Sequence, residues 1–570
     1  MNPVVKAQLS EFSSSNPVDG FKEQDYFEVY SIFSTANGIL HESVDPFDLH
    51  LKGDEFGLDG VGVLVQGENC PDADTAAAAI TDKKEPIVEF LFFQAKRSSK
   101  FDYGDISKFF DGVYGYFDGG MGCESEQLDD LLGATDHVYK SALRRNPKLR
   151  CLFATTGNYE SVQRIEKLID ANRSRLEDLN LFEAVDIQLL GAKELQAGYR
   201  SATNANSASF EFPKSQTLPD HQSVEQAYIG FVAAAQIMNL VTTGSATNER
   251  LNSSVFFDNI RDFNPNSEIN KEITRQLEGG DASSFVFKNN GVTVVANAIT
   301  RTGDRFTLDN YQIVNGCQTC NILFQCQQHI DDVFIPLRLI GSTDEDFVAS
   351  IIVGTNKQNE VKDEQFWALR PFMKDLEEFC RQQEDADRIF LERRENQYRR
   401  ESVERTRIVK PSDLLKCVAA MYLFQPNRAA RDYRGIRKEF EHEIFQEGHN
   451  VLPYYLACLA NYRFNFMLRN RRVDKKWKIF KYYVLYVLGI ESCDSKDVFK
   501  MPRKKQASAC AAILEILKDE DTVIDHITRV SKIVDEVIAA TGASSRAEIR
   551  DQLRLENFAK AFVQAYQAST

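Results

Sequence analysis

Apolar and polar positions along the first third of the chain predict a sheet flanked by helices. Residues 87–93 form an apolar run that is short and rich in β-forming residues, which is typical of a buried strand. Residues 57–65 alternate small and apolar side chains and predict a neighbouring strand, and residues 149–155 predict another buried one. Residues 21–35 and 104–117 have helical patterns. The order of these elements indicates an α/β domain.

Polar side chains stand at the ends of the two central predicted strands. Asp59 lies near the start of the first, and Gln94 and Lys96 lie at the end of the second, where their spacing puts them on one face. A carboxylate gives Mg²⁺ or Mn²⁺ a hard oxygen, the Gln94 amide or the Ala95 carbonyl gives another, and a lysine orients and activates water. This set predicts metal-dependent phosphodiester hydrolysis. The structural alternative is that Lys96 ends a strand, Asp59 forms a turn with Gly60 and Gln94 bonds to backbone.

The arrangement resembles the PD-(D/E)xK superfamily of restriction-like nucleases, in the variant where Gln replaces the second acidic residue. The resemblance covers residues 21–200 and implies a core of helix, three strands, helix and strand, with a weak first strand at residues 47–51. In that superfamily an acidic residue of the first helix often completes the metal site, which implies Glu28, with Glu23 in reserve. The departure at Gln94 removes a carboxylate and weakens a hard-cation site.

Short motifs in the second half of the chain form a separate pattern. They are Phe257-Asp258-Asn259-Ile260-Arg261, Phe287-Lys288-Asn289-Asn290-Gly291-Val292-Thr293, Gln312-Ile313-Val314-Asn315-Gly316-Cys317-Gln318-Thr319, Gly354-Thr355-Asn356-Lys357-Gln358-Asn359 and Phe390-Leu391-Glu392-Arg393-Arg394. In residues and order they resemble the AIPR family, named for abortive-infection phage resistance. The resemblance implies a part in bacterial antiphage defence and leaves the chemistry of this region open.

Turn and cap chemistry explains much of these motifs. Asn289-Asn290-Gly291 before an apolar run predicts a tight turn with positive φ, and Asn315-Gly316 predicts the turn from a strand into a helix that ends near Gln328. Free N–H groups at that helix start favour a phosphate. We therefore expect a polar cleft; the alternative is that the amide side chains only satisfy buried backbone groups. The residues expected to face the cleft are Asn290, Asn315, Gln318 and Thr319, and Asn356 is a further amide of the motifs.

Cysteine and histidine spacing in the same region imitates a zinc site. Cys317, Cys320, Cys326 and His329 have suitable ligand types and separations. However, the first two cysteines fall where a helix should begin, and free cysteine is a routine small core residue. We expect that these four side chains do not bind one metal.

Length and composition fit a multi-domain cytoplasmic protein. A chain of 570 residues is long enough for about three domains, and its 43% hydrophobic and 27% charged content is ordinary for globular proteins. No apolar stretch is long enough to span a bilayer, and the first residues lack signal-peptide features. Eleven cysteines at irregular spacing predict reduced thiols.

The net charge of −16 is unfavourable for a nucleic-acid-binding protein, but local charge decides where phosphates bind. Residues 388–410 and 463–481 are strongly basic, and the second segment is interleaved with aromatic residues. Such a pattern predicts a surface that follows a phosphate backbone and stacks bases. The alternative, favoured for the first segment, is a helix with buried aromatics and solvated charges. The candidate nucleic-acid-binding residues are Arg471, Arg472, Lys475 and Lys476, with Arg97 and Lys100 beside Lys96.

The expected organisation has three folded regions. Residues 1–200 form an α/β restriction-endonuclease-like domain, a mixed sheet flanked by helices, with residues 67–86 as a hairpin extension. Residues 201–216, rich in Ser, Asn and Ala, form a linker. Residues 217–410 form an α+β AIPR domain, and residues 411–570 form a mainly α-helical region.

Two functions compete for this organisation. The first is a Mg²⁺- or Mn²⁺-dependent endonuclease of antiphage defence that cuts DNA, or RNA, with an AIPR domain that senses or regulates. The second is a catalytically inactive nucleic-acid-binding or sensor protein, with Gln94 as a sign of decay. A phage-derived trigger and a homo-oligomer are compatible with both. An interaction scaffold without nucleic acid agrees less well with the basic, aromatic segment.

Overall fold

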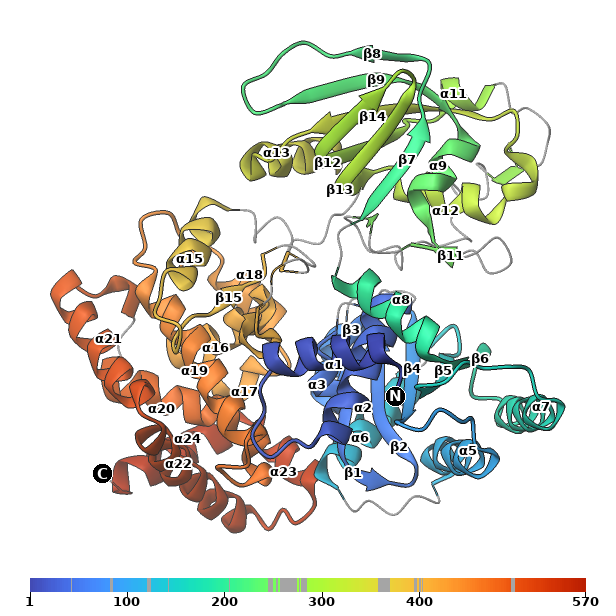
Figure 1. Ribbon diagram of the computed structural model, residues 1–570. Helices are drawn as coiled ribbons and strands as arrows, with labels where there is room; N and C mark the ends of the chain where they lie inside the picture. Colours follow the sequence, from blue (N-terminus) through green and yellow to red (C-terminus); the bar gives the residue numbers. More distant parts are fainter. Residues whose placement is uncertain are drawn as a thin grey trace. The chain divides into compact units, whose positions relative to one another are not determined.

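A computed structural model divides the chain into two compact units (Figure 1). The first contains Met1–Phe33, Val44–Gln196 and Arg370–Thr570, and the second contains Ser34–Ser43 and Ala197–Leu369. The structure describes residues 1–40, 42, 44–81, 86–119, 125–141, 143–203, 206–243, 250–252, 255–256, 274–275, 277, 284–356, 370–393, 397–398, 401, 403–493 and 498–569. The first unit therefore combines the two ends of the chain.

A mixed sheet organises the N-terminal part of the first unit. Its strands are β1 (His50–Glu55), β2 (Leu58–Val65), β3 (Glu68–Asn69), β4 (Val88–Lys96), β5 (Lys148–Thr155) and β6 (Ala184–Leu190). The strand order is β1-β2-β4-β5-β6, with β3 paired to β2. Strands β1, β2 and β4 are antiparallel, whereas β4, β5 and β6 are parallel. The strands expected at residues 57–65, 87–93 and 149–155 are thus present and adjacent.

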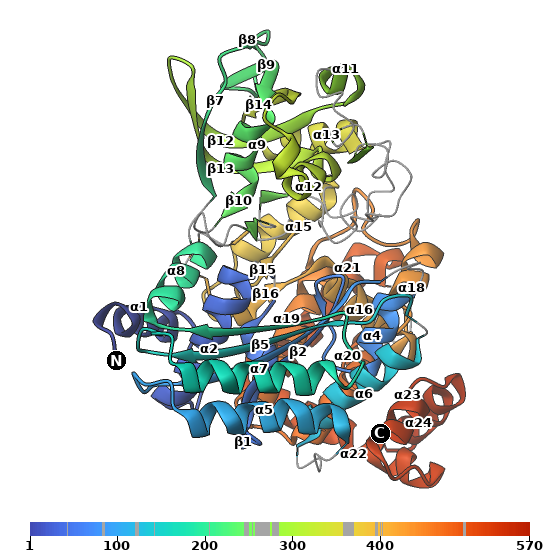
Figure 2. The same ribbon diagram turned by 90° about the vertical axis from the view of Figure 1, so that its right-hand side faces the viewer.

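Helices cover both faces of this sheet. They are α1 (Pro3–Ser15), α2 (Glu23–Phe33), α3 (Pro46–Leu49), α4 (Ala73–Ile80), α5 (Tyr103–Asp118), α6 (Glu126–Lys140) and α7 (Gln163–Glu177). The π-helical turn η1 (Ser34–Ile39) and most of helix α8 (Ala192–Thr203) belong to the second unit. Helices α5 and α7 run side by side along one face (Figure 2). There Val61 and Val63 of β2 and Phe90 and Phe92 of β4 form one core with α5, α6 and α7.

The opposite face of β2 is kept flat by glycine so that helices can approach it. A Cβ atom on Gly60 would lie 2.7 Å from Ile32 Cδ1 of α2, and one on Gly62 would lie 2.9 Å from Leu49 Cδ2 of α3. Real Cβ contacts are not this short, so a larger residue would force the ends of the Ile32 and Leu49 side chains to move. The glycines of β2 therefore leave room for these side chains of α2 and α3 beside the strands that carry the predicted site.

Two local expectations differ from the structure. Residues 67–86 are not only a hairpin extension: after β3, Asp72 caps helix α4 and accepts a hydrogen bond from the Thr75 amide. Four consecutive alanines favour helix, which explains the outcome. The weak strand expected at residues 47–51 is shifted, because Asp45 caps α3 and β1 starts only at His50. Residues 82–85 lie outside the described part.

A second sheet organises the second unit. Its strands are β7 (Ser207–Glu211), β8 (Ser215–Thr217), β9 (Gln226–Ala233), β12 (Val292–Thr302), β13 (Arg305–Asn315) and β14 (Phe334–Gly341), in the order β7-β13-β12-β14-β9-β8. The other elements are α9 (Ala234–Val241), β10 (Thr242–Thr243), β11 (Arg250–Leu251), α11 (Phe285–Lys288), α12 (Cys317–Gln325), η5 (Gln327–His329) and α13 (Glu345–Asn356). One face packs on α9 and α12 through a large apolar core. This unit is α+β, as expected for the AIPR region.

The linker expected at residues 201–216 takes a different form. Helix α8 continues to Thr203, and β7 and β8 then join the second sheet. Ser and Asn in this stretch favoured a linker by composition, but β7 pairs with β13 from Ser207 to Glu211. Pairing with a distant strand overrides a weak local preference. Residues 204 and 205 lie outside the described part.

Helices dominate the C-terminal part of the first unit. They are α15 (Pro371–Arg381), α16 (Pro411–Met421), α17 (Pro426–Ala429), α18 (Tyr433–Phe440), α19 (Leu452–Arg469), α20 (Lys481–Cys493), α21 (Arg503–Lys518), α22 (Glu520–Thr541), α23 (Arg546–Leu553) and α24 (Glu556–Ser569), with the short elements β15 (Phe390–Leu391), η6 (Arg405–Arg407), β16 (Ile408–Val409), η7 (Lys475–Phe480) and η8 (Val498–Lys500). Helices α16, α19 and α20 pack together through almost fully buried side chains. The helical region expected from residue 411 onward is present.

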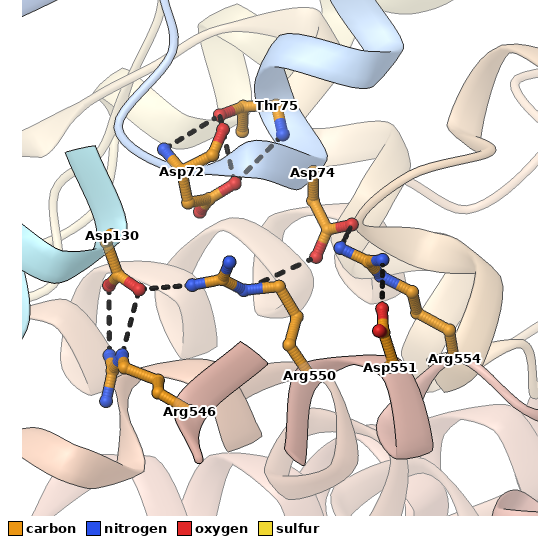
Figure 3. A network of polar contacts seen from close by, with 8 residues as sticks. All are labelled: Asp72, Asp74, Thr75, Asp130, Arg546, Arg550, Asp551 and Arg554. Atoms are coloured by element: carbon orange, nitrogen blue, oxygen red, sulfur yellow. Dashed lines mark hydrogen bonds and ion pairs between the residues drawn. The ribbon is translucent and has the colours of Figure 1, made fainter. Parts of the chain in front are cut away.

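Charged side chains join this helical region to the N-terminal sheet domain (Figure 3). Asp130 of α6 accepts hydrogen bonds from Arg546 at 2.8 and 3.0 Å and is also paired with Arg550. Asp74 of α4 pairs with Arg554. The first unit therefore joins Met1–Phe33 and Val44–Gln196 with Arg370–Thr570, a division that differs from the three consecutive domains expected from the sequence. Among the described helices, none is long and apolar enough to cross a membrane.

Candidate functional site

The pairing of β2 with β4 brings Asp59 and Gln94 together. Gly60 is paired with Phe93, so the next positions outward, Asp59 and Gln94, face each other. Gln94 Nε2 donates to Asp59 Oδ2 at 2.7 Å, and the Ala95 amide donates to the same oxygen at 2.6 Å. Asp59 is 9% exposed and Gln94 is 2% exposed. The predicted acid is therefore held rigidly at the strand ends.

Electrostatics link this pair to Glu28 and Lys96. Burial and the negative charge of Glu28 together raise the pKa of Asp59 to about 7. The Ala95 amide, the positive charge of Lys96 and the Gln94 amide act in the opposite direction. Two neighbouring carboxylates in a poorly solvated site resist ionising together. The four residues predicted as one site thus come together in the structure.

Two residues that the sequence did not suggest complete the surroundings of Glu28. His50 Nε2 lies 2.8 Å from Glu28 Oε2. Gln24 Nε2 donates to Glu28 Oε1 at 2.8 Å and lies 3.4 Å from the Ala95 carbonyl oxygen. Gln24 precedes Glu28 by one helical turn, a spacing that was readable in the sequence. His50 carried no such signal, because its contact depends on how β1 lies beside α2.

The donor set fits a small hard cation only in part. Asp59, Glu28 and the Ala95 carbonyl offer oxygen, which Mg²⁺ and Mn²⁺ prefer. The Gln94 amide was expected to act as an acceptor, but in this structure its nitrogen donates to Asp59. No group of three His, Cys, Asp or Glu side chains in the described part of the chain is placed to hold a metal. A cation here would rest on two carboxylates and a backbone carbonyl, with water completing its shell.

Basic residues at the end of β4 differ in their freedom to bind phosphate. Arg97 forms an ion pair with Glu23 at 2.8 Å, so the reserve acid Glu23 is engaged outside the Asp59 site. Lys100 is exposed in the loop that follows the strand, and Lys96 is half-buried. Phosphate binding by these residues stays a prediction.

The second basic segment is only partly as expected. Arg471, Arg472, Lys475 and Lys476 are exposed, but Arg472 pairs with Asp19 at 3.0 Å and Lys476 with Asp535 at 3.2 Å. Most of the aromatic side chains belong to the core, so the expected base-stacking surface is wrong for them: helical packing takes their rings. The buried rings are Tyr462, Phe464, Trp477 and Phe480.

The first basic segment has the structural character that the sequence favoured. Arg393 is buried and its Nε lies 2.5 Å from Glu377 Oε2. Arg407 pairs with Glu404, and its guanidinium lies over the Tyr462 ring. Arg394, Arg399 and Arg400 lie outside the described residues.

Two of the AIPR motifs pack against each other in the second unit. Gly291 and Gly316 both have positive φ, 83° and 95°, as the turn chemistry predicts. A Cβ on Gly316 would lie 2.8 Å from the Gly291 carbonyl oxygen, so glycine permits this close approach. Asn289 Oδ1 accepts from the Gly291 amide at 2.8 Å, and Asn289 Nδ2 donates to Thr319 Oγ1 at 3.1 Å. These contacts stabilise the turn.

The other motif residues are less closely tied. Asn290 is exposed, whereas Asn315 and Gln318 are half-buried; a common cleft stays a prediction. Helix α12 starts at Cys317 as expected but ends at Gln325, earlier than predicted. Cys320 and Cys326 are buried, and His329 is exposed. The motif Phe257-Asp258-Asn259-Ile260-Arg261, the side chain of Asn356, and Lys357-Gln358-Asn359 lie outside the described residues.

Comparison with family models matches residues 256–535 to the model described as AIPR protein. This range includes every motif on which the resemblance was based, and it continues from the second unit into helix α22 of the first. The match supports placing the chain in the AIPR family. No curated protein and no solved structure matches the chain. The N-terminal sheet domain lies outside the matched range, so its nuclease character is a separate question.

Proposed function

We propose that this protein is a metal-dependent endonuclease of bacterial antiphage defence. The observation that carries the proposal is the meeting of Asp59, Gln94 and Lys96 with Glu28 at one end of the mixed sheet. The order of helix, antiparallel strands, helix and parallel strand around it also agrees with the PD-(D/E)xK pattern. The AIPR match supports the role in defence, with the AIPR region as the sensing or regulating part.

Each residue has a distinct task in hydrolysing a phosphodiester. Asp59 and Glu28, with the Ala95 carbonyl, would hold Mg²⁺ or Mn²⁺, which would supply positive charge that stabilises the phosphate. Lys96 brings positive charge next to Asp59 and orients the water whose oxygen attacks phosphorus. Gln94 and the Ala95 amide fix the Asp59 carboxylate, so that its rotation does not have to be arrested during the reaction.

A second candidate function follows from the short ligand set. Among the residues that the structure describes, two carboxylates, Asp59 and Glu28, are near each other at the site, and Gln94 turns its amide nitrogen toward Asp59. A site with these properties suits a catalytically inactive protein that binds nucleic acid or senses infection. The same assay separates the two functions.

The test is cleavage by the purified full-length chain. Plasmid, single-stranded DNA and RNA are incubated with Mg²⁺ or Mn²⁺, beside the variants Asp59→Ala and Lys96→Ala. We expect cleavage of at least one substrate by the wild type and loss of at least a hundredfold in both variants, because each removes transition-state stabilisation. A phage-derived activator is supplied by adding lysate from infected cells to every arm.

Exposed charge changes on α6 serve as matched controls. Asp136→Ala and Lys140→Ala remove an acid and a base that pair with each other at the surface, and both variants should cut like the wild type. A blank with lysate alone gives the cleavage due to contaminating nucleases. Cleavage by Asp59→Ala that equals the wild type above this blank would refute the assigned site. Binding without cleavage in every arm would favour the second function.

A further inference from the structure

Both carboxylate oxygens of Glu28 are held by side chains, one on each side. His50 Nε2 contacts Oε2, and Gln24 Nε2 contacts Oε1. The Gln24 nitrogen also reaches the Ala95 carbonyl oxygen. Glu28 Oε1 and the Ala95 carbonyl oxygen therefore both contact Gln24 Nε2, whereas Glu28 Oε2 is turned toward His50. The side chain of Glu28 is oriented, rather than free to rotate.

His50 is well placed to fix this orientation. Its side chain is 2% exposed, and its ring packs edge-on against Phe21 with the centroids 5.7 Å apart. Its backbone is fixed as well: the amide donates to the Pro46 carbonyl, the carbonyl accepts from Gln127 Nε2 at 3.0 Å, and the residue pairs with Gly60 in β2. A buried imidazole fixed at this many points cannot follow a moving carboxylate, so the carboxylate is fixed by the imidazole.

The other ring nitrogen defines the tautomer. His50 Nδ1 is buried and has no hydrogen-bond partner among the residues that the structure describes. A proton on Nδ1 would be a buried unsatisfied donor, whereas a proton on Nε2 is donated to the Glu28 carboxylate. The tautomer with the proton on Nε2 therefore fits its surroundings best.

We infer that His50 is a positioning residue, which binds Glu28 Oε2 and so presents Oε1 beside the Ala95 carbonyl for a divalent cation. The inference rests on the proposed function, because it assigns to His50 a task within that metal site. A hydrogen bond from a second residue that orients a ligand typically changes metal affinity about 10- to 100-fold. His50 touches neither cation nor substrate.

The test measures Mn²⁺ binding to the full-length chain by titration calorimetry, independently of cleavage. His50→Phe keeps the ring shape but removes the donor, and we expect the dissociation constant for Mn²⁺ to rise about 10- to 100-fold. His50→Gln places an amide donor near the position of Nε2 and should recover most of this loss. In a Glu28→Gln background, His50→Phe should have little further effect, because the residue through which it acts is already altered.

His526→Leu is the matched control. His526 is also buried, and its Nε2 contacts the Val484 carbonyl in the helical region. It should lose thermal stability and keep the wild-type affinity for Mn²⁺, which shows that losing a buried histidine is not enough to weaken the site.

The possible outcomes separate the inference from the function on which it rests. Wild-type affinity in His50→Phe, or equal losses with and without Glu28, would overturn the positioning role and leave the nuclease proposal intact. A wild-type protein that neither binds Mn²⁺ nor cuts nucleic acid would overturn both. If His50→Phe does not fold, weak Mn²⁺ binding by a folded His50→Gln variant would equally contradict the inference.

Discussion

At the scale of single residues, the site shows that Asp59 is held in a place where it is costly to ionise. Its pKa of about 7 lies above the ordinary 3.8, mainly because of burial and the charge of Glu28. A group that binds its proton more tightly when folded favours folding at low pH and loses that contribution as pH rises through its folded pKa. Between pH 3.8 and about 7, ionisation of Asp59 therefore progressively lowers stability.

Replacing this acid should consequently stabilise the protein at high pH. In EDTA, we expect Asp59→Asn to raise Tm relative to wild type by a few degrees at pH 8, and by less at pH 4.5. Differential scanning fluorimetry across this range gives the comparison, with Asp136→Asn as an exposed control. An equal Tm difference at both pH values would contradict the assigned pKa. Adding Mn²⁺ should raise Tm in the wild type more than in Asp59→Asn.

The residues on the two strands were accessible from sequence, and those around Glu28 were not. Alternation along a strand puts Gln94 and Lys96 on one face, and a glycine-rich neighbour suggests Asp59. His50 reaches Glu28 because α3 ends and β1 begins at this residue. A local sequence pattern does not predict that the His50 imidazole, at the start of β1, will contact Glu28 of α2.

At the scale of elements, helix α23 depends on carboxylates from the opposite end of the sequence. Asp130 is 2% exposed and lies between Arg546 and Arg550, and Asp74 adjoins Arg550 and Arg554 (Figure 3). Burial raises the pKa of Asp74 to about 6 in spite of these arginines. Buried ion pairs contribute little net stability, but losing one partner is costly, because a charge is left without compensation.

Removing Asp130 should therefore destabilise the first unit. We expect Asp130→Ala to lower the free energy of unfolding by about 3 kcal/mol. Urea unfolding is followed by Trp477 fluorescence in a Trp367→Phe background, since Trp477 lies in the helical region and donates to Asp535. Asp551→Ala, which breaks an exposed pair with Arg554, should change it by less than about 1 kcal/mol. Similar losses of unfolding free energy in the two variants would show that the buried ion pairs stabilise the protein no more than the exposed pair does.

Sequence patterns predicted most of the strands and helices, but they did not predict which distant elements pack or pair with each other. The runs that became β2, β4 and β5 are predominantly apolar, so their burial on both faces could be predicted from the sequence. The linker expected at residues 201–216 was not found, because β7 forms a strand by pairing with β13, about a hundred residues later in the chain. The contact of α6 with α23 is equally remote, since Asp130 and Arg546 are 416 residues apart.

At the scale of the whole molecule, this acidic protein has a short segment with several exposed basic residues, Arg471, Arg472, Lys475 and Lys476. The ion pairs of Arg472 and Lys476 with Asp19 and Asp535 already compensate part of this charge. Arg471 and Lys475 are exposed, so they are the better placed of the four to meet phosphate. Buried rings leave backbone contact, rather than base stacking, as the mode of binding for this surface.

Neutralising this segment should weaken binding without altering the chemistry. We expect the combined Arg471→Gln, Arg472→Gln, Lys475→Gln and Lys476→Gln variant to reduce the salt dependence of duplex DNA binding, since each phosphate contact contributes a slope of about −0.9 on a log–log plot. Fluorescence anisotropy between low and moderate salt measures this slope. A control variant neutralises four exposed lysines elsewhere, Lys140, Lys500, Lys518 and Lys560. An unchanged slope in the first variant would assign the segment to solvated helix surface.

The ion pairs between α6 and α23 also order events during synthesis. Asp130 leaves the ribosome 416 residues before Arg546. At about 5–20 residues per second, the interval is roughly 20 to 80 s. Throughout that time the N-terminal sheet domain lacks its contacts with α23, and the carboxylates of Asp130 and Asp74 are not yet paired with the arginines. The N-terminal sheet domain therefore completes this part of its packing only after residue 546 has been synthesised.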